Sequence, residues 1–572
     1  MQIKNNISSG SHIFVTLCVF VILLLGIGLT GCVPLTIGPT PTPTRTPKPS
    51  MTPTPTPTLT PSPTPTPAFP VTVGCVAGAP PEACAALQMA SVQDPAHFAW
   101  VDGEAADVQL GFAADVPGAR LVGKWTYAVA VPFLTVEDEV TSADVLALWQ
   151  GGAPSPQSEF LAQRPLLVST GTQASLLQAW GVPTDSVRVV AASDLLSETT
   201  AANGWALVPF QNLVPQWKVL RVDGISLLEK GLQPDAYPFV LPLYLQSLNR
   251  PEVLDLLALD ATAFTNRDEG RMTIVVMTGV TAMTRATAQL MDSKGITYPA
   301  LDIKSWFLDA DFVHISNEVS FKPDCVAEGS GTMSFCSHDS YIGLLEEIRT
   351  NIVELTGNHL EDKGNEWVDY SLDMYRARGW QWFGGGANQA EGARPLTITH
   401  GVNRIAFIGC NTVGPFADDT SGGAARCDFE QEWANIRQLR DAGYQPIVTV
   451  QYLEDYNYMP TDPQIRDFRN LADAGAVMVQ GSQAHQAQTF EFYGETFIHY
   501  GLGNFFFDQM WSDGTRQEFV DRLTFYDGRL LSVDLRTAIM EEYGRPRPMT
   551  VGDANPAADR AKFLQMMFDL RP

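Results

Sequence analysis

Hydrophobic and polar positions alternate along two successive stretches of the chain in the pattern of α/β domains. In the first stretch, from about residue 75 to residue 249, short apolar runs separate amphipathic segments. Serines stand at or near the start of the amphipathic segments, where a helix N-cap is favoured. The predicted strands cover 108–112, 127–131, 166–168 and 187–190, and the predicted helices cover 142–149, 175–180 and 193–198.

A second cycle begins at Arg271, with apolar and β-branched runs that are typical of buried strands. The predicted strands cover 272–277, 312–315, 352–356, 404–408, 446–450 and 476–480, and the predicted helices cover 340–350, 366–378, 429–442 and 463–474. Strands that alternate with helices predict an α/β fold in both stretches. Polar residues gather after the strand ends, where α/β proteins place their sites.

The N-terminus has the pattern of an export signal. Lys4 precedes an apolar run over 13–25, and Leu29-Thr30-Gly31-Cys32 resembles the lipobox of bacterial lipoproteins. That resemblance implies cleavage before Cys32 and acylation of its thiol, so that the protein is anchored by lipid to the bacterial cell membrane, outside the cytoplasm. The alternative is a plain membrane-anchor helix over 13–29.

A spacer rich in Pro and Thr follows this signal. Residues 39–67 have no apolar face to bury, and Pro blocks both helix and sheet hydrogen bonds, so an extended polyproline-like stalk is expected. The predicted organisation is a signal over 1–31, a stalk over 32–70, a first domain over 71–255, a second domain over 265–545 and a tail over 546–572.

Composition narrows the classes of partner. The chain has 572 residues, with 37 Lys and Arg against 63 Asp and Glu, a formal charge of −26. Such an excess of acid argues against a nucleic-acid binder, which needs a basic face. A polyanionic partner would also be repelled at long range, so it requires a local basic patch or bridging cations.

The cysteines fall into close pairs once Cys18 in the signal and Cys32 are set aside. In an oxidising compartment local pairing is the natural proposal, although six cysteines allow 15 connectivities. A zinc site is a weaker interpretation, because no pair has CxxC spacing. The candidate disulfide partners are Cys75 with Cys84, Cys325 with Cys336, and Cys410 with Cys427.

One turn in the first domain has anion-binding chemistry. Ser169-Thr170-Gly171-Thr172 opens a predicted helix and resembles the oxyanion-binding turn of phosphate and sulfate receptors, and the domain as a whole resembles a periplasmic binding protein. A helix N-terminus with free N–H groups suits an anion, which makes Thr170, Gly171 and Thr172 candidates. The alternative is that these hydroxyls only cap the helix.

Four polar clusters follow strand ends in the second domain, and their order resembles the CapA family. These clusters are 316–318, 356–364, 481–485 and 500–508. Asn358-His359 with Asp362 and Gly364 matches the family's Asn-His-x-x-Asp-x-Gly, and Glu318 matches its Asn-Leu-Glu, although Ser316 replaces the Asn. Residues 502–505 match its Leu-Gly-Asn-Phe, and residues 384–388 match its Gly-x-Gly-x-Asn.

The CapA family is associated with poly-γ-glutamate and capsule biosynthesis and is similar to calcineurin-like metallophosphatases. The resemblance therefore implies a four-layer αββα sandwich with a metal centre at the strand ends. Glu318, Asn358 and His485 would be ligands of Mn, Fe or Zn, and His359 would be the catalytic acid or would orient the leaving group.

The sequence also departs from the family at three expected ligands. Val280 stands where the family has Asp, and Gln451 and Gln483 stand where it has His. Valine cannot ligate and glutamine replaces imidazole poorly, so a tight two-metal centre is not expected. Two hypotheses remain open: an enzyme that acts on a phosphoester or anionic polymer, and an inactive surface protein that binds a cell-envelope or capsular polymer or a small anion.

Overall fold

The computed structural model describes residues 69–103, 105–113, 117–233, 236–247, 249–327, 329 and 333–572. The predicted signal, Cys32 and nearly all of the predicted stalk lie outside these residues, so those expectations stay predictions. Among the described residues, no helix combines the length and the apolar character needed to cross a membrane.

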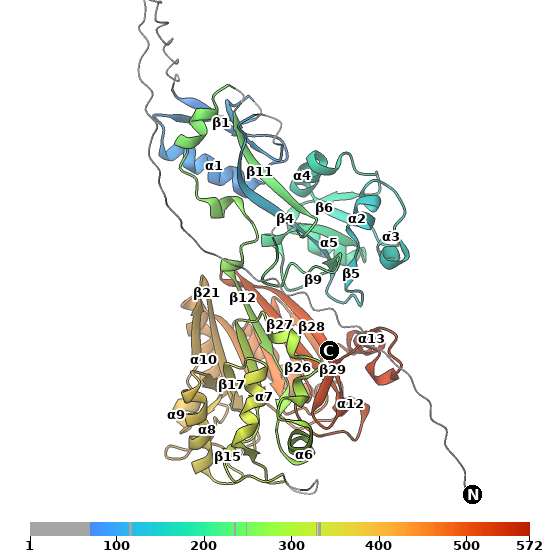
Figure 1. Ribbon diagram of the computed structural model, residues 1–572. Coiled ribbons are helices and arrows are strands. Elements are labelled where there is room, and N and C mark those ends of the chain that lie inside the picture. Colours follow the sequence, from blue (N-terminus) through green and yellow to red (C-terminus); the bar gives the residue numbers. More distant parts are fainter. Residues whose placement is uncertain are drawn as a thin grey trace, which may run out of the picture. The chain divides into compact units, whose positions relative to one another are not determined.

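The first domain is built on one mixed sheet (Figure 1). Two antiparallel strands, β4 (Arg120–Pro132) and β11 (Val240–Ser247), pair at its centre. The remaining strands are β1 (Val71–Cys75), β2 (Phe98–Trp100), β3 (Val108–Gly111), β6 (Leu166–Ser169), β7 (Arg188–Val190), β8 (Trp205–Pro209) and β9 (Trp217–Val219). The helices are α1 (Pro81–Gln93), α2 (Ser142–Trp149), α3 (Glu159–Ala162), α4 (Thr170–Trp180) and α5 (Leu195–Ala201).

Helix α4 begins earlier than the sequence predicted, at Thr170 rather than Ser175. The reason is local, because the Ser169 hydroxyl accepts a hydrogen bond from the Thr172 N–H at 3.1 Å and so caps the helix there. Ser175 does not cap a helix: its hydroxyl donates to the carbonyl of Gly78 at 2.6 Å. This bond ties α4 to the loop that follows β1.

The second domain contains two large sheets, as expected for the sandwich. The order of the first sheet is β18-β17-β14-β12-β27-β28-β29, and the order of the second is β20-β21-β23-β24-β26-β25. The first comprises β12 (Met272–Met277), β14 (Phe312–Asn317), β17 (Ile352–Glu354), β18 (Gln381–Phe383), β27 (Gln517–Tyr526), β28 (Arg529–Glu542) and β29 (Arg545–Pro548). The second comprises β20 (Leu396–His400), β21 (Asn403–Asn411), β23 (Gln445–Gln451), β24 (Met478–Ser482), β25 (Gln488–Tyr493) and β26 (Thr496–Gly501).

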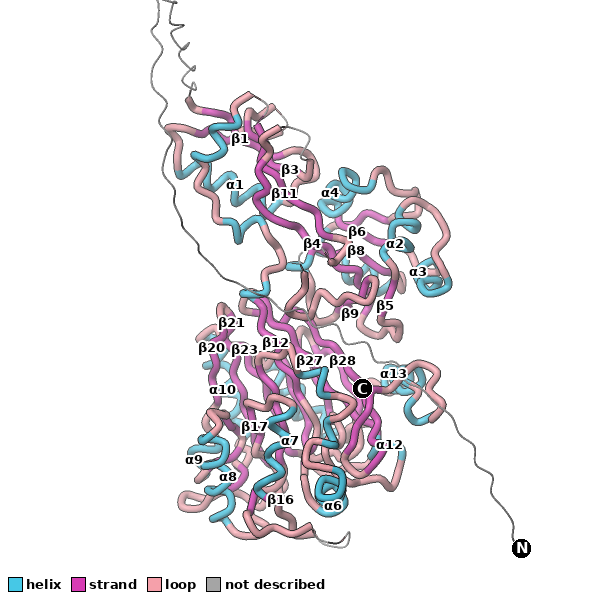
Figure 2. Tube along the Cα trace, in the orientation of Figure 1, coloured by secondary structure: helices cyan, strands magenta, loops and turns pink. Residues whose placement is uncertain are grey.

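Helices flank the strands of the second domain (Figure 2), and three apolar clusters hold this αββα sandwich together. Between the sheets, side chains such as Phe407, Phe497 and Leu523 form one core. Outside the first sheet lie α6 (Arg285–Lys294), α7 (Ile342–Glu347) and α8 (Asn365–Ala377), and outside the second lie α10 (Phe429–Asp441) and α11 (Asp462–Asp473). The α/β fold class predicted from the sequence is confirmed.

Residues 546–572, expected to be a tail, take part in this fold. Strand β29 pairs with β28, and helix α13 (Arg560–Asp569) follows. Phe563, Leu564 and Met567 of α13 are buried in the core between the sheets. The apolar face of this short helix, which the sequence analysis did not weigh, accounts for the difference.

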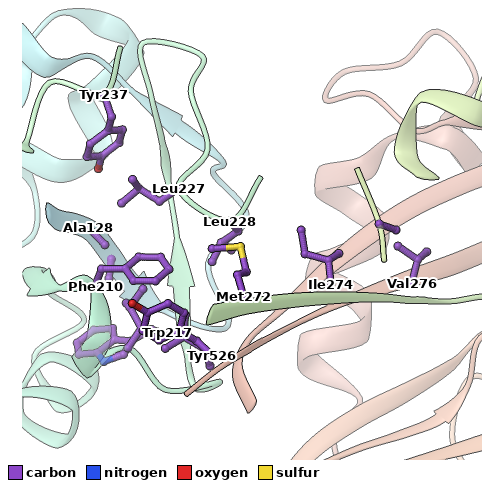
Figure 3. Packing of buried hydrophobic residues seen from close by; sticks show 14 of the residues in the cluster. Ala128, Phe210, Trp217, Leu227, Leu228, Tyr237, Met272, Ile274, Val276 and Tyr526 are labelled. Atoms are coloured by element: carbon purple, nitrogen blue, oxygen red, sulfur yellow. The ribbon is translucent and has the colours of Figure 1, made fainter. Parts of the chain in front are cut away.

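The two domains share one apolar core (Figure 3). Phe210 of the first domain packs edge-on against Tyr526 of the second, with ring centroids 5.1 Å apart. The Asn266 amide donates to the carbonyl of Thr126 of the first domain at 2.9 Å, and Arg529 donates to the carbonyl of Leu213 at 2.7 Å. Apolar packing and hydrogen bonds thus join the domains.

All three predicted cysteine pairs are disulfides in the structure. Their Cα–Cα separations are 6.1 Å for Cys75–Cys84, 6.0 Å for Cys325–Cys336 and 4.8 Å for Cys410–Cys427, within the range of ordinary disulfides.

Removal of the third disulfide should destabilise the second domain. Cys410 and Cys427 are 17 residues apart, and a crosslink over such a loop restricts the unfolded chain by about 3 kcal/mol. We expect the double variant Cys410→Ala/Cys427→Ala to lose about that much free energy of unfolding in urea titrations. An unchanged unfolding curve, or free thiols at these positions in the native protein, would contradict the pairing.

Candidate functional site

The candidate site lies at the carboxyl ends of strands from both sheets. Glu318 directly follows β14, and Asn358 follows β17, which is parallel to β14. Gln451 is the last residue of β23, and Gln483 directly follows β24, which is parallel to β23. Because parallel strands present their carboxyl ends at one edge, each sheet contributes a pair of polar side chains.

The side-chain amide of Gln451 joins these four residues. Its Nε2 atom lies 3.3 Å from Oε1 of Glu318 and 3.2 Å from Oδ1 of Asn358, and it also donates to Oε1 of Gln483. Glu318, Gln451 and Gln483 are almost completely buried. Gln451 therefore supplies the donors that desolvated oxygens require. We call Glu318, Asn358, Gln451 and Gln483 the amide cluster.

This donor set does not fit the metal centre that the resemblance implies. The oxygens of Glu318 and Asn358 accept hydrogen bonds from Gln451, so a cation bound to them would displace a neutral N–H donor. The cluster contains one carboxylate and no imidazole, whereas Mn, Fe and Zn sites draw on carboxylate and imidazole ligands. Within the described ranges, no three His, Cys, Asp or Glu side chains are arranged to hold a metal.

His359 lies beside the amide cluster and is held by a carboxylate. Its Nδ1 atom lies 2.7 Å from Oδ2 of Asp362, and its ring packs on Phe335 at a centroid distance of 4.5 Å. Burial lowers the pKa of His359, but the hydrogen bond to Asp362 and the charges of Glu318 and Glu454 outweigh it and raise this pKa above its ordinary value. The surroundings of His359 thus stabilise its protonated form relative to a free imidazole.

His485, the third expected ligand, has partners other than the amide cluster. Its Nδ1 atom lies 2.9 Å from Oδ1 of Asn504, and its ring packs against Phe507 and Tyr456 at centroid distances of 5.3 and 6.4 Å. Hydrogen bonds therefore link two of the three expected ligands, Glu318 and Asn358, through Gln451. The role of His485 stays a prediction.

A buried ion pair beside this site was not foreseen from the sequence. Arg285 opens α6 with a φ of 46°, and its guanidinium pairs with Asp508. Asp508 also accepts a hydrogen bond from the N–H of Ala286 at 3.1 Å, so a residue far along the chain caps this helix. The guanidinium lies 4.9 Å from the ring centroids of Phe335 and Phe507. Asp508 ended a recognised motif, but no sequence signal marked Arg285.

Glu361 is a second residue near this site that the sequence analysis did not identify. Both of its carboxylate oxygens are buried without a hydrogen-bond partner in the described chain. Burial, with the charge of neighbouring Asp362, raises the pKa of Glu361 to about 7. The segment 358–362 thus carries two titratable side chains whose pKa values are shifted upward.

The turn expected to bind an anion forms the first turn of α4 in the first domain. Ser169 caps this turn, and its hydroxyl also donates to the Thr172 hydroxyl at 2.9 Å. Thr172 is buried, whereas Thr170 and Gly171 are exposed. The bond satisfies Thr172 internally, and anion binding at this turn stays a prediction.

A four-layer sandwich with polar side chains at its strand ends defines the second domain as metallophosphatase-like. Residues 274–509 match the family described as bacterial capsule synthesis protein PGA_cap, which confirms the resemblance stated for this domain. The chain is 22% identical over 305 residues to a capsule biosynthesis protein CapA from Bacillus anthracis, covering 51% of this chain and 73% of that one. It is 23% identical to a PGA biosynthesis protein CapA from Bacillus subtilis, covering 40% of this chain and 62% of that one.

Solved structures resemble each domain at low scores. A phosphatase from Mycoplasma pneumoniae is 11% identical, with a TM-score of 0.31, covering 47% of this chain and 95% of that one. A phosphate transport receptor from Vibrio cholerae is 11% identical, with a TM-score of 0.27, covering 32% of this chain and 90% of that one.

The Asp362 carboxylate should control the titration of His359. Because the folded-state pKa is raised, the stability that His359 contributes is complete below about pH 6.5 and is lost as pH rises through the folded pKa. We expect Asp362→Asn to lower this pKa, as measured by NMR titration of the imidazole with His97 as an internal reference. An unchanged titration midpoint would contradict the assignment.

Replacement of Glu361 should stabilise the protein in a pH-dependent way. A carboxyl group whose folded-state pKa is about 7 destabilises the fold increasingly as pH rises above about 4.5. Glu361→Gln should therefore raise the unfolding temperature more at pH 8 than at pH 5. The exposed Glu430→Gln serves as the matched control, and an equal effect of both variants at both pH values would argue against a buried, unpartnered Glu361.

Proposed function

We propose that this protein takes part in the biosynthesis or attachment of a capsular or poly-γ-glutamate-type polymer. We also propose that its amide cluster binds a ligand without hydrolysing it. The match of residues 274–509 to the capsule synthesis family and the names of the two CapA relatives support the process. The contacts of Gln451 support the binding role.

The contacts of the Gln451 amide with Glu318 and Asn358 carry this proposal. Metal-assisted phosphoester hydrolysis needs a cation that polarises the substrate and lowers the pKa of bound water. In this site the Glu318 and Asn358 oxygens are engaged by an amide, and Val280 supplies no ligand. What remains is one carboxylate among amide donors and acceptors, beside a His359 whose pKa is raised.

We further propose that the protein acts at the outer face of the bacterial membrane, held by a lipid on Cys32. The lipobox-like residues 29–32 and the Pro- and Thr-rich stretch after them motivate this location. The three disulfides agree with an oxidising compartment.

Metal analysis of the purified protein tests the binding role. We expect less than stoichiometric Mg, Ca, Mn, Fe or Zn, and no phosphoesterase activity when these ions are added. The variant Val280→Asp/Gln451→His/Gln483→His restores an aspartate and two imidazoles, and it should gain stoichiometric Mn or Zn.

The control for that experiment is Asn358→Ala in both backgrounds. This substitution should abolish metal binding in the restored variant and leave the metal content of the natural protein unchanged. Stoichiometric metal in the natural protein that disappears in Asn358→Ala would overturn the proposal and favour the hydrolase. If Val280→Asp disturbs folding, the double variant Gln451→His/Gln483→His is compared with the natural protein instead.

A further inference from the structure

A cavity of about 540 Å³ lies between the two domains, away from the amide cluster. The first domain lines it with β9, with Arg221 of the short strand β10 (Arg221–Val222) and with residues 226–230. The second domain lines it with residues 305–309, with β28 and with Arg560 at the start of α13. The volume is in the range of sites for small molecules.

The lining of this cavity reverses the charge balance of the chain. Over the whole sequence, acidic residues outnumber Lys and Arg by 63 to 37. In the cavity, basic side chains exceed acidic ones. The basic lining residues are Lys218, Arg221, Lys230, Arg536 and Arg560, and the acidic ones are Asp138, Glu229, Asp309 and Asp534.

Two of the cations share a single carboxylate. Lys218 Nζ lies 2.8 Å from Oδ1 of Asp138, and Arg560 Nη1 lies 2.7 Å from Oδ2 of the same residue. Burial lowers the pKa of Lys218, and the charge of Arg560 adds to this effect, while Asp138 opposes it. The single negative charge of Asp138 therefore does not balance the positive charges of both Lys218 and Arg560.

Asp534 lies among four cations, of which Arg522 also pairs with Asp309, and Lys218 and Arg560 with Asp138. Its contact to Nε of Arg536 is long, at 3.4 Å, and Arg536 also donates to the carbonyl of Trp306 at 3.1 Å. Burial would raise the pKa of Asp534, but the nearby cations lower it below the ordinary value. These cations are Arg536, Arg522, Arg560 and Lys218.

We propose that this cavity binds a small anion that carries carboxylate or phosphate groups. Guanidinium and ammonium groups that share too few carboxylates attract such oxygens, and partial burial strengthens the attraction. The proposal goes beyond the proposed function, because none of the cavity residues belongs to the amide cluster, and binding here would bridge the two domains.

Isothermal titration of the purified protein with inorganic phosphate, citrate and tri-glutamate tests the site, and it separates a phosphate ligand from a carboxylate ligand. We expect saturable binding of at least one anion, which weakens as salt is raised from 50 to 300 mM. Arg536→Gln should weaken that binding at least tenfold. Arg466→Gln, which removes the same charge from the exposed side of α11, should leave it unchanged.

Arg221→Gln provides a second test from the first domain's side of the cavity, at a side chain that is 42% exposed. It should weaken anion binding severalfold while leaving the fold and the behaviour of the amide cluster intact. Absence of binding for all three anions would overturn the proposal, as would equal affinities in Arg536→Gln and Arg466→Gln. Neither result would bear on the metal analysis that tests the proposed function.

Discussion

The packing of two sheets face to face in the second domain is the constraint on which the amide cluster depends. Phe407 and Phe497 from one sheet meet Leu523 and Val275 from the other in a continuous apolar core. This burial sets the sheets' relative position, because apolar side chains from both faces interdigitate. Glu318 and Asn358 follow strands of one sheet, and Gln451 and Gln483 lie at the strand ends of the other. The cluster therefore forms only while this core fixes the relative position of the two sheets.

The departures from the family are electrostatically consistent with one another. A carboxylate at position 280 beside Glu318 would place two like charges in a buried site without a cation to separate them. Val280 removes one of these charges, and Gln451 supplies hydrogen bonds to the other. Together the replacements leave a single carboxylate that accepts hydrogen bonds from an amide, so no second like charge has to be balanced by an ion.

The sequence predicted those parts of the fold that depend on local pattern. Strand β12 and helix α2 have the predicted bounds, because apolar periodicity and caps are properties of neighbouring residues. The burial of α13 depends on contacts with distant segments, which periodicity does not report. The same holds for the site: motif order located Glu318 and Asn358, whereas the pairing of Arg285 with Asp508 joins residues over 200 positions apart.

The disulfide between Cys75 and Cys84 would have a mechanical consequence if the protein is tethered through Cys32, as proposed above. Strand β1 is the first strand of the described chain, and it is paired in parallel with both β2 and β3. A pull along this strand shears both ladders at once instead of opening one bond after another. The crosslink passes the remaining tension covalently into α1, so the segment between the two cysteines cannot lengthen under load.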